Sequence, residues 1–258
     1  MRLWRLRWAL KQLLNLKNYK NQNNTLLNPH AYYYALFAKF INHWHTQPII
    51  LKLKTGESIE IIEFMSLYIY QEIFIDGCYD LDLHGKQPYI IDVGANTGLF
   101  SLRMKYLYPD SNITCYEPYP PNFEKLEQTV QRNQLNDVQV KMEAVSDKMG
   151  KIQLYIHPKN IGGHSLYQQE AGKKSIEVDT VVLHDILHKK QCDLLKLDCE
   201  GAEYDIIQSI TPALAQQIKN IIYEATPACY NVKKLNQYLN DLGYSVYKSR
   251  GLYIAQLI

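Results

Sequence analysis

Residues 89–108, YIIDVGANTGLFSLRMKYLY, contain a short apolar strand, a glycine bend and a helix in direct succession. The strand covers YIIDV and carries one acidic residue, Asp92, near its end. Gly94 and Gly98 frame the bend, and the segment after them has the composition of a helix. A strand that turns sharply into a helix is the repeating unit of α/β proteins, so this stretch sets the expected fold class.

The same alternation continues to the end of the chain. Further strands are expected at 112–118, 138–147, 192–198 and 220–227, and helices at 121–134, 202–210 and 231–243. Such alternation predicts a doubly wound, mainly parallel sheet with helices on both faces. The last two extended segments, YSVYKS and LYIAQLI, predict an antiparallel hairpin that turns at Arg250-Gly251.

The N-terminal third follows a different pattern. Residues 31–44 and 66–74 are expected to be helical, and LKLKTGESIEII is expected to form a hairpin. We therefore divide the chain into a basic helical and hairpin extension, residues 1–85, and a main domain, residues 86–258.

Composition restricts the class of protein. The 258 residues are 47% hydrophobic and 21% charged, as in a folded soluble protein. The five cysteines form no CxxC pair, which argues against a disulfide framework or a zinc site and favours a cytoplasmic location. The sequence contains no apolar run of about 18 residues, so no transmembrane helix is expected.

Charge is distributed unevenly along the chain. Nine basic residues precede the first acidic one, Glu57, so the rest of the chain is mildly acidic. An acidic body without a basic stripe argues against nucleic acid as a partner.

The first 20 residues, MRLWRLRWALKQLLNLKNYK, predict an amphipathic helix. Its apolar stripe consists of Leu3, Leu6, Leu10, Leu13 and Leu14. We favour packing of this helix on its own domain or on a second subunit. The alternative is peripheral contact of residues 1–20 with the inner face of a membrane, since Trp and Arg suit that interface. Charges interrupt the apolar run, so we do not expect a signal peptide.

The glycine bend is the first candidate binding site. Ligands of doubly wound sheets lie beyond the carboxyl ends of the strands, and glycine lets the backbone approach them closely. The spacing is GxxxG and not GxGxxG, so the dinucleotide pattern of NAD-dependent enzymes is absent.

Glu117 ends the next strand. A carboxylate at this position suits two hydrogen bonds from ribose hydroxyls. A solvent-facing glutamate at a strand end is the alternative. In the following strand, Ala144 and Val145 of EAVSD could form an apolar slot for a flat base, although an ordinary strand exit has the same appearance.

Three charged residues mark the strand at 192–198. Lys196, Asp198 and Glu200 alternate with apolar residues, so they are expected to share one face of the strand. Burial without a purpose would be costly, which favours a reaction site at the carboxyl end. The alternative is a structural ion-pair network in which Lys196 neutralises both carboxylates.

Together, YIIDVGANTGLF, Glu117, EAVSD, EVDTVVLHDIL and LLKLDCEGAEYDII resemble the FkbM family of S-adenosylmethionine-dependent methyltransferases. The likeness covers about residues 70–230, and KLDCEGAE is its most specific part. It implies a class I (Rossmann-like) methyltransferase fold that binds S-adenosyl-L-methionine. The residues expected to bind this cofactor are Asp92, Gly94, Ala95, Asn96, Gly98, Glu117, Pro118, Ala144 and Val145.

Family members typically methylate hydroxyl groups of sugars or secondary metabolites. An alcohol is a poor nucleophile until a base takes its proton. Asp198 is the first candidate for that base, Glu200 would position a second hydroxyl, and Lys196 would tune their charge. His164, in a glycine-rich loop, is the competing base because its ordinary pKa suits neutral pH. A less favoured scheme places Mg²⁺ between Asp198, Glu200 and Glu224.

The sequence therefore predicts an O-methyltransferase acting on a sugar, glycan or glycolipid. The alternatives are methylation of a soluble metabolite, an NAD-dependent oxidoreductase and a non-catalytic cofactor-binding protein. The sequence is also compatible with a homo-oligomer.

Overall fold

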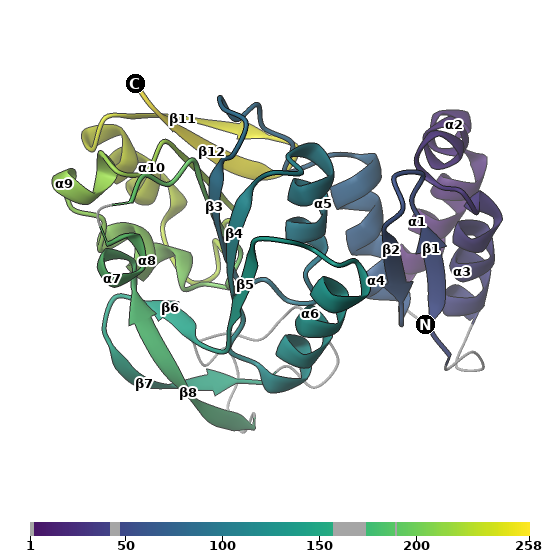
Figure 1. Cartoon of the computed structure of the whole chain (residues 1–258), viewed down its shortest axis with the longest axis horizontal. Helices are drawn as coiled ribbons and strands as arrows, with labels where there is room; N and C mark the ends of the chain where they lie inside the picture. The colour runs from purple at the N-terminus through teal and green to yellow at the C-terminus, as the bar shows by residue number, and fades with distance from the viewer. Residues whose placement is uncertain (1–2, 42–46, 157–173, 189) are drawn as a thin grey trace. The chain divides into compact units, whose positions relative to one another are not determined.

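The computed structural model describes residues 3–41, 47–156, 174–188 and 190–258 (Figure 1). The chain forms two compact units, Met1–Gly77 and Cys78–Ile258. This boundary lies before the expected one at residue 85, so residues 78–85 belong to the second unit. Two of their contacts show why: Asp80 pairs with Arg103 at 2.6 Å, and Tyr79 bonds to Asp198.

The first unit contains helices and one hairpin, as expected. Its elements are α1 (Leu3–Leu14), α2 (Leu16–Thr25), α3 (Pro29–Ile41), β1 (Ile49–Lys52), β2 (Ser58–Ile61), α4 (Phe64–Tyr70) and the π-helical turn η1 (Gln71–Ile75). Strands β1 and β2 are antiparallel. Gln22 lies in the centre of the unit, where its side-chain amide donates to Gln71 at 3.0 Å and accepts from the hydroxyl of Tyr70 at 2.8 Å. Because these groups are buried, this network fixes α2 against η1.

Helix α1 packs against α4 of the same unit. The ring of Trp8 packs against those of Phe64 and Tyr68, each with a centroid distance of 5.3 Å, and Ala9 and Gln12 are buried on the same side. The leucine stripe is on the other side, where Leu10, Leu13 and Leu14 are exposed and Leu6 is partly buried. Helix α1 therefore packs on its own unit, as favoured from the sequence, but through the side that carries Trp8 and not through the leucine stripe.

The second unit is built around a seven-stranded sheet with the order β11-β12-β10-β9-β3-β4-β5. The strands are β3 (Tyr89–Val93), β4 (Asn112–Tyr116), β5 (Val138–Lys141), β9 (Leu194–Leu197), β10 (Asn220–Tyr223), β11 (Tyr244–Ser249) and β12 (Leu252–Leu257). All neighbours from β5 to β10 run parallel, while β12 is antiparallel to both β10 and β11. The expected parallel sheet with a C-terminal antiparallel hairpin is confirmed.

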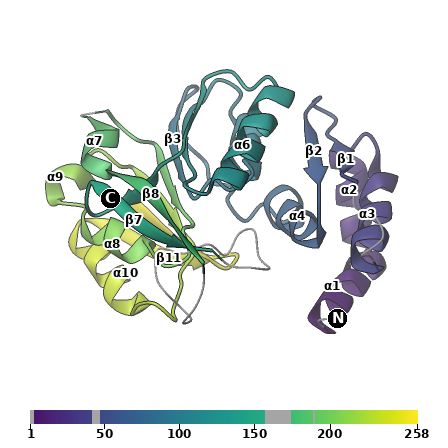
Figure 2. The same ribbon diagram turned by 90° about the horizontal axis from the view of Figure 1, so that it is seen from below.

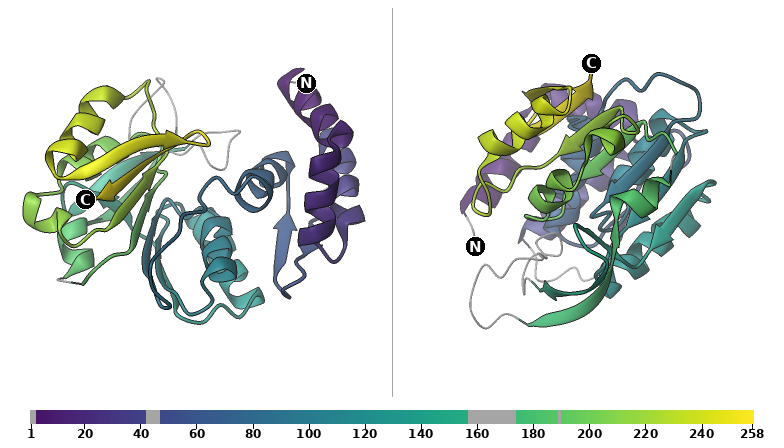
Figure 3. Two further views of the ribbon diagram at one scale, coloured as in Figure 1. Left: turned by 90° about the horizontal axis from the view of Figure 1, so that it is seen from above. Right: turned by 90° about the vertical axis from the view of Figure 1, so that its left-hand side faces the viewer.

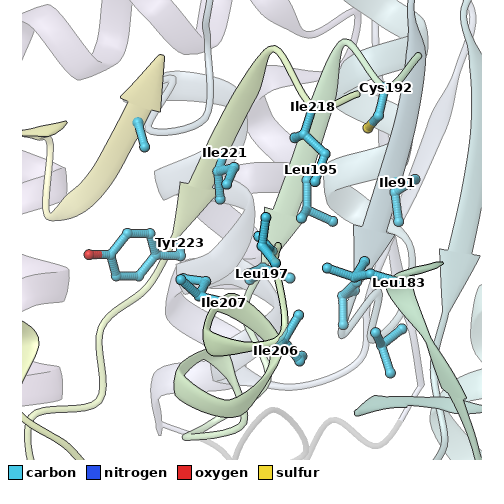
Figure 4. Packing of buried hydrophobic residues seen from close by; sticks show 14 of the residues in the cluster. Ile91, Leu183, Cys192, Leu195, Leu197, Ile206, Ile207, Ile218, Ile221 and Tyr223 are labelled. Atoms are coloured by element: carbon cyan, nitrogen blue, oxygen red, sulfur yellow. The ribbon is translucent and has the colours of Figure 1, made fainter. Parts of the chain in front are cut away.

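Helices cover both faces of this sheet (Figures 2 and 3). One face carries α5 (Leu99–Leu107) and α6 (Pro120–Arg132). The other carries α7 (Leu183–Leu187), α8 (Glu203–Gln208), α9 (Pro212–Ala215) and α10 (Val232–Asp241). Between the sheet and this second layer, Leu195 and Leu197 pack with Ile206, Ile207 and Tyr223 in a large apolar cluster (Figure 4).

One strand differs from expectation. The segment 138–147 is not continuous, because β5 ends at Lys141 and β6 (Ala144–Ser146) begins a separate sheet. That sheet has the order β6-β8-β7, with β7 at Gly150–Tyr155 and β8 at Ser175–Val182. Ala144 and Val145 therefore belong to the three-stranded sheet and not to the seven-stranded sheet that contains β5.

Candidate active site

The glycine bend lies at the carboxyl end of β3. From β3 the sheet continues with β4 and β5 on one side and with β9 and β10 on the other, so the bend lies at the switch point of the sheet. Gly94 has φ +74°, and a Cβ there would come within 2.0 Å of the backbone oxygen of Asp198. Gly98 has φ +85°, and its Cβ would meet a methyl of Leu126 at 2.8 Å. Only glycine therefore fits at either position, and the bend touches the end of β9 directly.

Glu117 holds the other side of this bend. Its carboxylate accepts the backbone N–H of Asn96 at 2.8 Å and that of Tyr119 at 3.0 Å. Burial raises the pKa of Glu117 to about 7, although both backbone donors and Lys196 act to lower it. A buried carboxylate with two oxygens fixed at the end of β4 is available to accept hydrogen bonds from a ligand.

Lys196 and Asp92 form a buried pair across neighbouring strands. They are partners in the β3–β9 register, with 3.1 Å between Nζ and Oδ1, and both are almost fully buried. Lys196 also donates to the backbone oxygen of Gly94 at 2.8 Å, and Asp92 accepts from the hydroxyl of Ser101 at 2.8 Å. Burial alone would lower the pKa of Lys196, but Asp92 and Asp198 raise it above its ordinary value. Lys196 is therefore a permanent cation.

Asp198 follows β9 and faces outward from this pair. Its side chain is 32% exposed and its Oδ2 lies 3.7 Å from Nζ of Lys196. The same oxygen accepts the hydroxyl of Tyr79 at 3.1 Å. Sequence reasoning missed Tyr79, which lies in a loop with no periodic signal. The alternation expected from the sequence correctly places Lys196 and Asp198 together.

Glu200 reaches the site differently. Strand β9 ends at Leu197, and Glu200 has φ +53°, so strand alternation does not determine its direction. Burial raises its pKa to about 8, and the nearby carboxylates of Asp198, Glu224 and Glu203 add to this effect. At neutral pH, Glu200 therefore retains its proton more readily than an ordinary glutamate.

Glu203, a second residue that sequence reasoning missed, shapes the turn from within. It is fully buried and accepts the backbone N–H groups of Cys199 at 2.8 Å and Gly201 at 2.9 Å. The hydroxyl of Tyr230 donates to it at 3.2 Å. Glu203 thus fixes the backbone that carries Asp198 and Glu200. It lies within the GAE part of KLDCEGAE, so the motif itself was an available signal.

The glycine bend thus lies between Glu117, at the end of β4, and Asp198, at the end of β9. This is the arrangement that the sequence resemblance implied. The family model for the methyltransferase FkbM domain matches residues 92–246, more than half of the chain. The chain belongs to the FkbM methyltransferase family.

Two relatives are similar along most of their own length. Methyltransferase sdnD of Sordaria araneosa is 28% identical, with 71% of this chain and 83% of that protein covered. The 31-O-demethyl-FK506 methyltransferase FkbM of Streptomyces tacrolimicus is 24% identical, with 67% and 80% covered. Membership makes this FkbM protein an S-adenosylmethionine-dependent methyltransferase, as predicted, and sets aside the NAD-dependent alternative.

Among solved structures, the methyltransferase FkbM of Methylobacillus flagellatus KT is similar in fold. The TM-score is 0.50 at 12% identity, with 96% of this chain and 60% of that chain covered. The strand order agrees with this likeness, and the class I methyltransferase fold is confirmed.

Other predicted residues of this FkbM protein have different surroundings. Ala144 packs in a small apolar cluster with Leu154 and Val178, whereas Val145 joins the large cluster on β9. Both side chains are buried, so a base could meet them only at their backbone. Their role, like those of Ala95 and Pro118, stays a prediction. His164 lies outside the described residues.

Two features of the described residues of this FkbM protein concern the metal and the membrane. Among these residues, no three His, Cys, Asp or Glu side chains gather closely enough to hold a metal ion. None of the helices described is both long and apolar enough to cross a bilayer.

Proposed function

We propose that this FkbM protein transfers a methyl group from S-adenosylmethionine to a hydroxyl group of a saccharide. One observation carries the proposal. The partly exposed carboxylate of Asp198 follows directly on the backbone that the glycine bend touches at Gly94. Groups suited to the cofactor and groups suited to an alcohol therefore meet at one edge of the sheet.

The residues of the bend fit a nucleoside cofactor. Gly94 has no room for a side chain, and Glu117 offers a buried carboxylate for ribose hydroxyls. Among the described residues, Oδ1 of Asn96 is a buried acceptor without a hydrogen-bond partner, which suits a donor on a bound ligand. When bound, the cofactor supplies a methyl group on a positively charged sulfur, which is a good leaving group.

The acidic residues after β9 then have two tasks. Tyr79 and Lys196 both contact Oδ2 of Asp198, which leaves Oδ1 to orient an acceptor hydroxyl. Glu200, with a pKa of about 8, is the stronger base once it is ionised, and is therefore better matched to receive the hydroxyl proton. This assignment reverses the order of the sequence-based scheme, in which Asp198 was the first candidate for the base.

A saccharide is the favoured acceptor because two carboxylates in one turn can each bind one of two adjacent hydroxyls. The printed name of the Streptomyces tacrolimicus relative supports transfer to oxygen within the family. A hydroxyl of a soluble secondary metabolite is the second candidate. The name of the same relative favours it, because that name gives 31-O-demethyl-FK506 and not a glycan. We propose no role for nucleic acid.

The test compares glycans and small metabolites from host cells with and without the protein, by mass spectrometry. A glycan that gains the mass of one methyl group supports the saccharide. A methylated metabolite together with unchanged glycans contradicts it. The Glu200→Gln variant, which keeps the shape of the side chain but removes the proposed base, serves as the control with little activity.

A further inference from the structure

The outward face of the first unit is apolar where its first two helices meet. Helix α1 ends at Leu14, and the side chain of Asn15 begins α2 by accepting the backbone N–H groups of Lys17 and Asn18. Leu14 and Leu16 flank this corner with 82% and 80% of their surfaces exposed. With Leu10 and Leu13, which are also exposed, they form what we call the leucine corner.

This exposure follows from how α1 packs. The contacts of Trp8 with Phe64 and Tyr68 use the opposite side of the helix. The leucines therefore remain uncovered although they are the most apolar residues of α1. Contiguous exposed apolar side chains of this kind mark interaction sites more often than chance.

Basic side chains surround the leucine corner. Arg7 and Lys11 are exposed one turn apart, in the row beside Leu10 and Leu14. Lys17 and Lys20 are exposed at the start of α2, and no acidic residue precedes Glu57. The two helices of the corner thus carry basic side chains and no carboxylate of their own.

These charges distinguish between possible occupants. If two copies of the chain paired through this corner, each copy would bring the same cations and no carboxylate from residues 1–56, which is unfavourable. An anionic lipid surface offers both an apolar layer for the leucines and negative headgroups for the lysines and arginines.

We propose that the leucine corner and its basic surroundings bind this enzyme to the surface of an anionic membrane. The leucines enter the boundary between headgroups and acyl chains, and Arg7, Lys11, Lys17 and Lys20 contact the lipid phosphates. The proposal is independent of the acceptor, because it concerns where the enzyme is located and not what it methylates.

The test is co-sedimentation of the full-length protein with vesicles of phosphatidylcholine, with and without phosphatidylserine. Wild-type protein should sediment with the anionic vesicles and lose binding as salt is added. The variant L13S/L14S/L16S should bind the vesicles at least about tenfold more weakly, because the partial burial of each leucine in the lipid contributes to the binding free energy. The variant R7Q/K11Q/K17Q should lose a similar factor on anionic vesicles.

Matched controls come from the second unit. Met149 and Ile258 are also exposed, and the variant M149S/I258S should bind vesicles as the wild type does. All replaced side chains are exposed, so folding is expected to persist, and circular dichroism checks this.

Two outcomes would overturn the proposal. The first is wild-type protein that does not sediment with phosphatidylserine vesicles at low salt. The second is a leucine variant that sediments normally but changes from dimer to monomer by light scattering, which would show that the corner joins two copies.

Discussion

The hydroxyl of Tyr79 donates to Oδ2 of Asp198 across 3.1 Å, although 119 positions separate the two residues in the chain. The ring of Tyr79 is buried and meets Phe100 edge to face with a centroid distance of 5.1 Å. Burial and the charge of Asp198 hold the pKa of Tyr79 well above its ordinary value. Tyr79 therefore remains a hydrogen-bond donor throughout the working pH range and fixes one oxygen of Asp198.

Removing this donor should reduce turnover. In Tyr79→Phe, Asp198 keeps its charge but loses the bond that orients it, so kcat should fall about tenfold. Affinity for S-adenosylhomocysteine should change little, since the lost hydroxyl bonds to Asp198. Tyr89→Phe is the matched control, because it also removes one hydroxyl bond, to Thr114. Equal losses of kcat in both variants would contradict a positioning role.

The buried pair of Lys196 and Asp92 should be important for stability. In Lys196→Met the carboxylate of Asp92 is left buried without a cation, and the free energy of unfolding should fall by about 3–5 kcal/mol. Adding Asp92→Asn should restore part of this loss. Lys219→Met is the control, because Lys219 pairs with Asp193 at 2.7 Å but is half exposed, and it should cost about 1 kcal/mol or less. Urea unfolding measures all three, and additive losses in the double variant would contradict the pairing.

Cofactor affinity should depend on the protonation of Glu117. Its pKa of about 7 means that acidification converts the carboxylate to a neutral acid, which accepts hydrogen bonds more weakly. The affinity for S-adenosylhomocysteine, measured by calorimetry, should therefore fall severalfold from about pH 8 to about pH 6. Glu117→Gln should bind weakly at every pH. A wild-type affinity that does not vary with pH would exclude this role.

The pH profile of methyl transfer should identify the base. A carboxylate with a pKa of about 8 accepts protons only when ionised, so kcat/KM should rise through about pH 8 in the wild type. Glu200→Gln should lose about a hundredfold in kcat together with this inflection. The exposed Glu177→Gln leaves both unchanged. If the inflection persists in Glu200→Gln and disappears in Asp198→Asn, Asp198 is the base after all.

Gly94 should tolerate no side chain. A methyl group there would lie 2.0 Å from a backbone oxygen that cannot move without displacing β9. Gly94→Ala is expected to lose more than about 4 kcal/mol of folding free energy or to be insoluble. Gly150 also has positive φ, +133°, but its Cβ would meet nothing within 4 Å. Gly150→Ala should thus lose about 1–2 kcal/mol from strain alone, and similar losses in both would contradict the steric argument.

The sequence predicted those features of the fold and the site that depend on residues close together in the chain. Apolar runs ending in glycine indicated the strands, and the turn at Arg250-Gly251 indicated the final hairpin, because these signals repeat over a few positions. Glu117 and Asp198 were found because they end strands, and parallel strands bring their carboxyl ends to one edge of the sheet.

Tertiary structure decided the rest. The leucines of α1 share one side of the helix by periodicity, yet only the packing of Trp8 shows that this side faces outward. Helical periodicity determines which residues lie together, but the surface that covers them belongs to distant parts of the chain. For the same reason the bond from Tyr79 to Asp198 has no local signal, and the change of sheet between Lys141 and Ala144 depends on pairing with β8.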